Sequence, residues 1–474
     1  MARGAAKKRT AAGDRSARAA AMAIGPVGAV LGSLFLRPYA DALALPAIAR
    51  GYLPLSRAWA AGLEAEGSVD RFMAATPWDG KTTGRIERVL AGLDQRKAAH
   101  AQANEAWLAS FFNGPCEEEH LAAAESRRIA AADRLMAARG AFLPLHLRRR
   151  FPGVRFAIAD AQEVERRHGL RLESDQAAFA PPAVAPDIER SASFRQGVRS
   201  ISWLRFPLTL AGATDWVWAR AVEPSDSIGA PGPTVVFAHG IALESEMWRG
   251  QADPSIFLAP RGMRSIAVEG PFHSRRRLAG TYGGEPVLSQ GPLGLLDYFH
   301  RHVIEIGLLT AWARKTYGGP VAVAGVSLGA LTAQLVATEA RHWPAPMRPD
   351  VLMLVTTSDA VERVAFESSL SASLGVPEAL AQAGWHRDSV ARWLPLIEPN
   401  GEPVLPADRI LMVLGSHDDL THFTGGLSLV DRWKVPPENL FVRRRGHFTA
   451  GLGIAFDRKP LDRLASVLTA AGKQ

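Results

Sequence analysis

Ser327 stands between two glycines in the segment Gly325-Val326-Ser327-Leu328-Gly329. An apolar run precedes this segment and an alanine- and leucine-rich run follows it. The pattern predicts a buried strand that turns sharply into a helix, with Ser327 exposed at the turn. Gly325 and Gly329 lack the Cβ atoms that would hold the strand and the helix apart. A serine held in this way can attack a carbonyl carbon if a neighbouring base takes its proton.

A histidine and an aspartate that could complete such a site follow two later apolar runs. Asp418 comes just after the strand predicted for residues 410 to 414, and His447 follows the strand predicted for residues 440 to 442. Because catalytic loops gather where parallel strands end, we expect both side chains near Ser327. His447 would take the serine proton, and Asp418 would orient the imidazole.

Two other aspartates are alternatives for the acid. Asp419 adjoins Asp418, and Asp359 follows the strand predicted for residues 351 to 356. The segment from His417 to His422 also contains side chains of the kinds that bind metals, but it lacks a fixed helical spacing of ligands. We therefore expect neither a metal nor another cofactor.

Two backbone amides could stabilise the negative charge that develops on the attacked carbonyl oxygen. The N–H of Leu328 is one, because it begins the helix after the turn. The loop after the apolar strand 234 to 238 reads His239-Gly240-Ile241 and offers the second donor, most simply at Ile241. Gly240 keeps that backbone accessible, and we expect His239 to be structural.

Charge and cysteine content exclude several classes of protein. The formal net charge is +8, but residues 1 to 20 carry six basic side chains against one acidic one. The rest of the chain is close to neutral, so no nucleic-acid surface is indicated. Cys116 is the single cysteine, which excludes an intramolecular disulfide.

The first 40 residues read as a basic tail followed by a short apolar segment. The apolar stretch from Ala21 to Leu36 is interrupted by glycines and a proline and is short for a membrane-spanning helix. A disordered tail, peripheral contact of residues 1 to 36 with a membrane surface and an export signal all stay open. We expect a cytoplasmic protein, with membrane association as the alternative.

The character of the remaining chain changes near residue 181. The apolar spacing over residues 41 to 180 predicts a helical region, with long helices over residues 85 to 112 and 117 to 147. After a proline-rich linker, residues 190 to 474 predict a mostly parallel, doubly wound α/β sheet. A helical lid is expected over about 359 to 406. The predicted strands cover residues 201 to 208, 215 to 222, 234 to 238, 263 to 269, 321 to 324, 351 to 356, 410 to 414 and 440 to 442.

Two arginine runs fall near the predicted catalytic edge. They contain Arg275, Arg276, Arg443 and Arg444. Such runs are usually solvated, but at this edge they would favour an acyl substrate that carries phosphate or carboxylate. We therefore take these four residues as candidates for the substrate rim.

These residues together resemble the α/β-hydrolase superfamily. The segment Glu269-Gly270-Pro271-Phe272, with Trp248-Arg249 upstream and the Ser327 turn downstream, resembles the abhydrolase-domain-containing protein 18 group. The resemblance covers roughly residues 195 to 470 and implies an α/β-hydrolase fold with ester or lipid hydrolysis in outline. It maps the triad onto Ser327, Asp418 and His447, and it assigns no role to the Glu269 segment.

The function expected from the sequence is that of a serine hydrolase of the esterase or lipase type. It would cleave a carboxylic ester, with a lipid or an anionic acyl ester as the substrate, through an acyl-enzyme on Ser327. An acyltransferase that uses the same three residues is one alternative. A binding or scaffold protein without activity on the same fold is another, because fold does not fix function.

Overall fold

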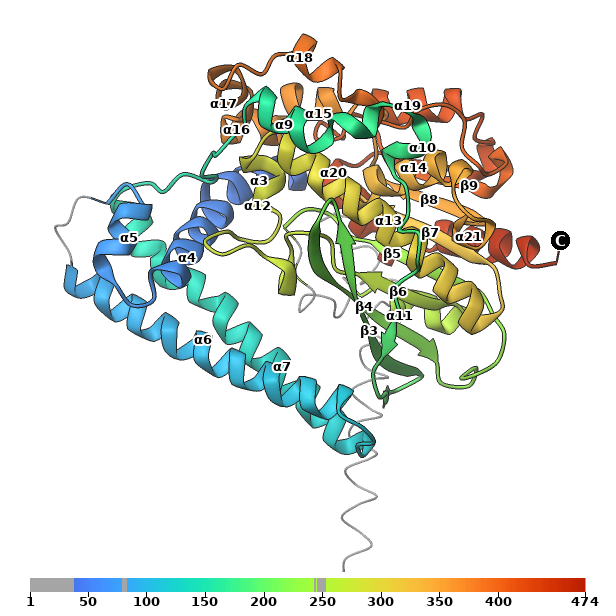
Figure 1. Cartoon of the computed structure of the whole chain (residues 1–474), viewed down its shortest axis with the longest axis horizontal. Helices are drawn as coiled ribbons and strands as arrows, with labels where there is room; N and C mark the ends of the chain where they lie inside the picture. Colours follow the sequence, from blue (N-terminus) through green and yellow to red (C-terminus); the bar gives the residue numbers. More distant parts are fainter. Residues whose placement is uncertain (1–37, 79–82, 243, 245–252, 474) are drawn as a thin grey trace, which may run out of the picture.

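The structure is a computed structural model, shown in Figure 1, and describes residues 38–78, 83–242, 244 and 253–473. The basic and apolar segment over residues 1 to 36, for which membrane contact was one of the open alternatives, lies outside this range. So do Trp248 and Arg249, which contributed to the resemblance noted above.

A ten-stranded mixed sheet lies at the centre of the described chain. Its strand order is β1-β3-β4-β6-β5-β7-β8-β9-β10, with β2 paired to β3. Neighbouring strands from β6 to β10 are parallel, whereas β4 is antiparallel to β3 and to β6. The strands are β1 (Glu189–Arg190), β2 (Phe194–Gln196), β3 (Arg199–Leu210), β4 (Ala213–Pro224), β5 (Thr234–Ala238), β6 (Arg264–Val268), β7 (Val321–Val326), β8 (Val351–Val355), β9 (Ile410–Gly415) and β10 (Leu440–Arg443).

The parallel part of the sheet is covered by helices on both faces, which explains why its strands are short, continuous apolar runs. One face packs against α13 (Pro292–Tyr317), α14 (Leu328–Glu339) and α19 (Phe423–Arg432). The other packs against α11 (Ser255–Leu258) and α21 (Lys459–Ala471). All eight strands predicted from the sequence are confirmed, with ends within two residues. The short strands β1 and β2 were not predicted.

The N-terminal region is helical and packs against the antiparallel end of the sheet. The prediction of one helix over residues 117 to 147 is wrong at its C-terminal end. The helix stops at Ala137, and a 3-10 turn at Ala138–Phe142 separates it from the next helix. The elements are α3 (Pro38–Ala47), the π-helix η1 (Ile48–Tyr52), α4 (Leu53–Ala65), α5 (Val69–Ala75), α6 (Thr83–Phe112), α7 (Glu118–Ala137), η2 (Ala138–Phe142), α8 (Leu143–Arg148), α9 (Ala161–His168), η3 (Gly169–Leu172) and α10 (Asp175–Ala178).

Aromatic side chains join this helical region to the sheet. Trp107 of α6 lies 5.4 Å from Trp203 of β3 and 6.2 Å from Trp218 of β4, measured between ring centroids. Figure 1 shows the α6 and α7 pair as a long hairpin that runs beside the body of the molecule toward β3 and β4. The helical region therefore shares a hydrophobic cluster with the sheet.

Between β8 and β9 the chain leaves the sheet and forms short helices above its carboxyl edge. These are α15 (Val361–Glu367), α16 (Ser369–Leu374), α17 (Val376–Gln382), α18 (Arg387–Ala391) and η10 (Leu394–Leu396), all within the segment expected to form a lid. In Figure 1 they lie together at the top of the molecule. The first two place Phe366 and Leu370 against the pocket described below.

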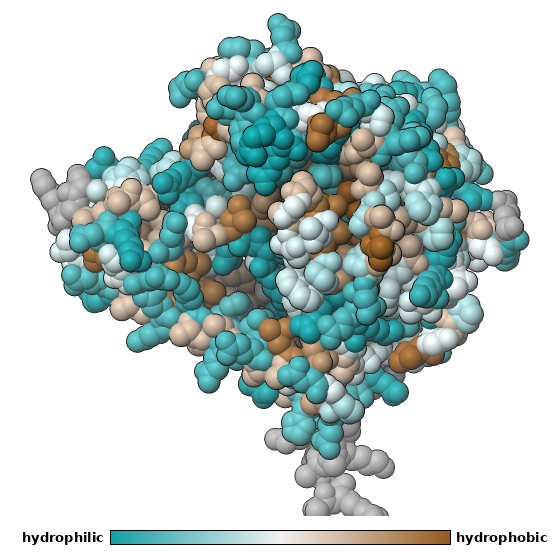
Figure 2. Space-filling model, viewed as in Figure 1, coloured by the Kyte–Doolittle hydropathy of each residue, from teal (hydrophilic) through white to brown (hydrophobic). Residues whose placement is uncertain are grey.

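The described surface has no broad apolar face in the view of Figure 2, where apolar residues form scattered patches among hydrophilic ones. None of the helices in the described ranges has both the length and the apolar character that a bilayer crossing requires.

Candidate active site

Ser327 occupies the turn between β7 and α14 in a strained backbone conformation. Its φ of 55° and ψ of −123° lie in a region that residues with a Cβ rarely adopt. A Cβ on Gly325 would fall 2.1 Å from the carbonyl oxygen of Gly329, and one on Gly329 would fall 2.1 Å from that of Ala238. Both glycines are therefore required sterically, and the turn presents Ser327 at the carboxyl end of the sheet.

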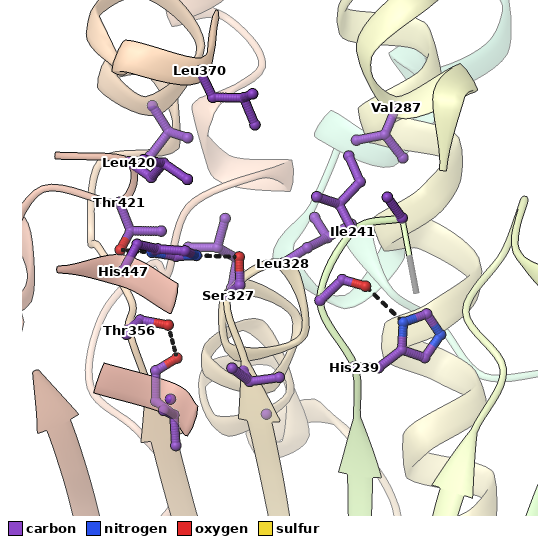
Figure 3. Close-up of a pocket in the computed structure, with 18 of the residues that line it drawn as sticks. His239, Ile241, Val287, Ser327, Leu328, Thr356, Leu370, Leu420, Thr421 and His447 are labelled. Atoms are coloured by element: carbon purple, nitrogen blue, oxygen red, sulfur yellow. Dashed lines mark hydrogen bonds between the residues drawn. The ribbon is translucent and has the colours of Figure 1, made fainter. Parts of the chain in front are cut away.

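The structure brings together the three side chains that the sequence singled out. His447 Nε2 lies 2.9 Å from Ser327 Oγ, and His447 Nδ1 lies 2.9 Å from Asp418 Oδ2. Figure 3 shows the imidazole aimed at the serine hydroxyl. Asp418 follows β9, and His447 begins the short helix α20 (His447–Leu452) after β10. With this geometry the serine hydroxyl donates to Nε2, while Nδ1–H donates to the carboxylate.

Asp418 is held as a carboxylate by a turn that was not predicted from the sequence. Its Oδ1 accepts the amides of Leu420 and Thr421, each at 3.0 Å, and its Oδ2 accepts the Thr421 hydroxyl at 2.7 Å. Burial alone would raise the pKa of Asp418, but the charge of His447 and these hydrogen bonds lower it to about 2. The aspartate is thus ionised and oriented before any substrate binds.

The pKa of His447 is raised above its ordinary value. Burial by itself would lower it, but the charge of Asp418 and the hydrogen bond to it outweigh burial, and the charges of Asp41 and Asp419 add to the effect. The site therefore stabilises the imidazolium that forms when the histidine takes a proton.

Neither alternative acid contacts His447. Asp419 is exposed, and Asp359 accepts a hydrogen bond from Ser428 at 2.6 Å. Among the described residues no group of three or more potential metal ligands lies close enough to hold an ion.

The two residues expected to supply the oxyanion donors, Leu328 and Ile241, line the same pocket as Ser327. Leu328 is the first residue of α14, so its amide has no carbonyl partner within the helix. The carbonyl of Gly240 accepts a hydrogen bond from His239 Nδ1 at 2.7 Å, drawn as a dashed line in Figure 3. In a trans peptide the N–H points opposite to the C=O, so this hydrogen bond fixes the direction of the Ile241 N–H.

A second histidine, not singled out from the sequence, holds the same loop. His273 Nδ1 donates to the carbonyl of Pro271 at 2.8 Å, and its Nε2 accepts the Ala242 amide at 3.2 Å. His239 Nε2 likewise accepts the Gly270 amide at 3.0 Å. Two buried imidazoles thus tie the loop after β5 to the loop after β6. Burial lowers the pKa of His239 to about 4 and that of His273 well below its ordinary value, so both are neutral.

A pocket of about 710 Å³ opens above Ser327 and is lined almost entirely by apolar side chains. Its volume falls within the range of small-molecule sites. Of the described residues that line it, Glu362 is the only carboxylate, and no lysine or arginine is present. Glu362 is itself paired with Arg387 at 2.7 Å. The cavity therefore favours an uncharged, apolar ligand.

The expectation that the arginine runs form a substrate rim is wrong, since none of the four lines the pocket. Arg276 is buried, where it binds Glu305 at 2.6 Å and Asp215 at 2.7 Å. Arg275 forms an ion pair with the fully buried Glu269 and lies over the rings of three tryptophans, Trp107, Trp203 and Trp218.

The second run also makes no contact with the pocket. Arg443 binds Asp457 at 3.0 Å, and Arg444 is exposed. A run of like charges does not show which of its members the fold will bury, because that depends on acidic partners distant in the sequence. Glu269, which had no assigned role, is the buried partner of Arg275.

The sheet order, the strained serine turn and the loops gathered at the carboxyl edge define an α/β-hydrolase fold. No protein-family model matches the chain. No curated protein matches it either. The narrower resemblance to the abhydrolase-domain-containing protein 18 group therefore gains no support.

Solved structures with a similar fold include hydrolases from several sources. A cold-adapted esterase from an Arctic intertidal metagenomic library is 18% identical, with 58% of this chain and 97% of that one covered and a TM-score of 0.37. An S-formylglutathione hydrolase from Agrobacterium tumefaciens is 12% identical, with 58% and 98% covered and a TM-score of 0.40. A lipase in an open form is 18% identical, with 57% and 100% covered and a TM-score of 0.37. These similarities are too low to transfer a substrate.

Proposed function

We propose that this chain is a serine hydrolase that cleaves carboxylic esters with an apolar acyl group. The observation that carries the proposal is the alignment of Ser327 Oγ, His447 and Asp418 through two contacts of 2.9 Å, at the base of an apolar pocket. Such a relay serves to deprotonate a serine at neutral pH. A buried structural histidine would need neither a strained serine nor a preoriented carboxylate.

In the proposed reaction Ser327 Oγ attacks the ester carbonyl carbon while His447 Nε2 takes the hydroxyl proton. Asp418 stabilises the resulting imidazolium, and the amides of Leu328 and Ile241 bind the oxyanion. Collapse of the intermediate breaks the ester C–O bond, and the alcohol leaves with the proton from His447. Water, deprotonated by the same histidine, then attacks the acyl-enzyme and releases the acid and the free serine.

The acyl group is proposed to be uncharged and apolar because of what surrounds Ser327. Helices α15 and α16 contribute Phe366 and Leu370, and η1 contributes Ile48 to the wall. An acyl chain that ends in carboxylate would lose its hydration there without meeting a cation among the described lining residues. The pocket thus argues for a lipid-like acyl ester and against an anionic one.

The test is a matched set of p-nitrophenyl esters that differ in the acyl group alone: acetyl, octanoyl, hexadecanoyl and the carboxylate-terminated suberyl. We expect kcat/KM to be higher for octanoyl than for acetyl and to fall by about tenfold or more for suberyl relative to octanoyl. Ser327→Ala should abolish hydrolysis of all four, by up to about 10⁶-fold in kcat. Equal rates for octanoyl and suberyl esters would contradict the substrate, and undiminished activity in Ser327→Ala would contradict the mechanism.

A further inference from the structure

The N-terminal helix α3 reaches the helix that carries His447. Asp41 of α3 is buried, and its Oδ1 accepts the amides of Phe448 at 2.6 Å and of Thr449 at 3.3 Å. Its Oδ2 accepts the Thr449 hydroxyl. These amides belong to the first turn of α20, where no carbonyl within the helix can pair with them. Asp41 therefore caps α20 from the opposite end of the chain.

Gly446 explains why a distant residue performs this task. It precedes His447 at the position where a serine, threonine or aspartate normally caps a helix, and it has no side chain to do so. A Cβ on Gly446 would fall 2.4 Å from Asp41 Cγ. The space left by the missing side chain is the space that Asp41 fills.

Asp41 also adds its charge to the surroundings of His447. Burial disfavours the protonated imidazole, whereas the charges of Asp418, Asp41 and Asp419 all favour it. Among these three charges, that of Asp418 has the largest effect on the pKa of His447. Cationic groups lie at the other end of α20, where Arg443 donates to Ala450 O at 3.4 Å and Arg445 donates to Thr449 O at 3.5 Å. Asp41 is thus the carboxylate at the first turn, next to the reacting histidine.

The same N-terminal segment builds part of the pocket wall. Ile48, Tyr52 and Leu53 follow α3 directly and line the cavity above Ser327. A buried ion pair of 2.9 Å between Arg57 of α4 and Glu285 of α12 (Glu285–Ser289) ties this segment to the body of the molecule. The N-terminal helical region therefore contacts the helix that carries His447 and also forms part of the pocket wall.

We propose that Asp41 is a positioning residue for the reaction, which caps the His447 helix and makes the N-terminal helical segment an integral part of the active site. This inference rests on the proposed hydrolase function. Asp41 touches neither the serine nor the substrate and acts through the position and charge state of His447.

The first test separates the charge of Asp41 from its hydrogen bonds. Asp41→Asn keeps a side-chain oxygen for the amides of Phe448 and Thr449 but removes the negative charge. We expect the acid limb of the kcat/KM profile for the octanoyl ester to move to lower pH, with KM unchanged. Asp70→Asn, at an exposed aspartate of α5, is the matched control and should leave the profile in place. An acid limb that does not move in Asp41→Asn overturns the charge contribution.

The second test moves the cap from one end of the chain to the other. Asp41→Gly should lower kcat by about tenfold or more through loss of the cap. Adding Gly446→Ser restores a local cap in the space that Asp41 has vacated, and we expect most of kcat to return while the acid limb stays at its lower pH. If Asp41→Gly has the wild-type kcat, or if its kcat is lowered and Gly446→Ser restores none of it, the capping role is wrong.

A measurement without substrate distinguishes failure of this inference from failure of the proposed function. In protein with isotope-labelled histidine, the NMR titration of the His447 ring, assigned with His447→Gln, should show a lower pKa in Asp41→Asn than in wild type. That shift would appear even if no ester were cleaved. Equal His447 pKa values in wild type and Asp41→Asn, in a protein that does hydrolyse esters, would overturn the charge contribution of Asp41 and leave the proposed function standing. This comparison also decides the charge contribution if Asp41→Gly fails to fold.

Discussion

His239 fixes the peptide bond that follows Gly240, because its Nδ1 donates to the Gly240 carbonyl at 2.7 Å while its Nε2 accepts the Gly270 amide. Both ring nitrogens are used, so one tautomer of the neutral ring is selected. The peptide so held is the one whose N–H belongs to Ile241. His239 transfers no proton in the proposed reaction, but it thereby orients one of the proposed oxyanion donors.

Replacing His239 should therefore impair the chemical step more than binding. In His239→Ala the Gly240 peptide is free to rotate, and we expect kcat to fall by up to about 100-fold, since one oxyanion donor contributes 10² to 10³. KM should change little. Steady-state kinetics with the octanoyl ester checks this, with His120→Ala, an exposed histidine of α7, as the control. A raised KM with unchanged kcat would place His239 in substrate binding instead.

Thr421 should matter through Asp418. Thr421→Val keeps the shape of the side chain but removes the hydroxyl that donates to the carboxylate at 2.7 Å. A hydrogen bond to a charged group contributes about 1.5 to 3 kcal/mol, so we expect kcat to fall by about tenfold or more. Thr421→Ser, which keeps the hydroxyl, should retain most of the activity. Equal rates in Thr421→Val and wild type would show that the backbone amides alone orient Asp418.

Stability should decrease as the pH falls below the ordinary histidine range. An unfolded histidine takes up its proton near pH 6.5, whereas folded His239 stays neutral down to about pH 4. The unfolded state then binds more protons, so the free energy of unfolding declines from about pH 6.5 toward pH 4, by roughly 3 kcal/mol for this residue. Urea unfolding at a series of pH values measures the decline, which should be smaller in His239→Gln. If the free energy of unfolding declined equally with falling pH in both proteins, the decline could not be assigned to His239.

Arg275 should prove structural. Arg275→Met leaves the buried carboxylate of Glu269 without its partner, and we expect the free energy of unfolding to fall by about 3 to 5 kcal/mol. Arg444→Ala, at an exposed position of the second run, should change it by less than about 0.5 kcal/mol. Urea unfolding gives both values. A stable Arg275→Met protein with a selectively raised KM for the suberyl ester would restore Arg275 to the substrate rim.

Much of this site could be predicted because its parts are local in sequence. The glycines around Ser327 mark a turn that few other residues allow, and apolar runs before Asp418 and His447 mark the strands that end at the same edge. Parallel pairing then brings the three residues together without any knowledge of the loops. The α/β-hydrolase fold expected from these features is confirmed.

The remaining residues depend on contacts that no local pattern encodes. Asp41 accepts a hydrogen bond from Phe448, which lies near the other end of the chain. Runs of arginine are usually solvated, but Arg275 is paired with Glu269 and lies over tryptophan rings, and both contacts come from distant parts of the sequence. Thr421 could have been found, because a threonine three residues after an aspartate at a strand end is well placed to close a hydrogen-bonded turn.

The most direct test of the central claim is to trap the nucleophile. Wild-type protein and Ser327→Ala are each treated with a fluorophosphonate that carries an alkyl chain, and the adduct is located by mass spectrometry of proteolytic peptides. We predict one adduct in wild type, on Ser327 in the peptide that spans β7 and α14, and none in Ser327→Ala. Equal labelling of the two proteins, or an adduct on another residue, would contradict the account.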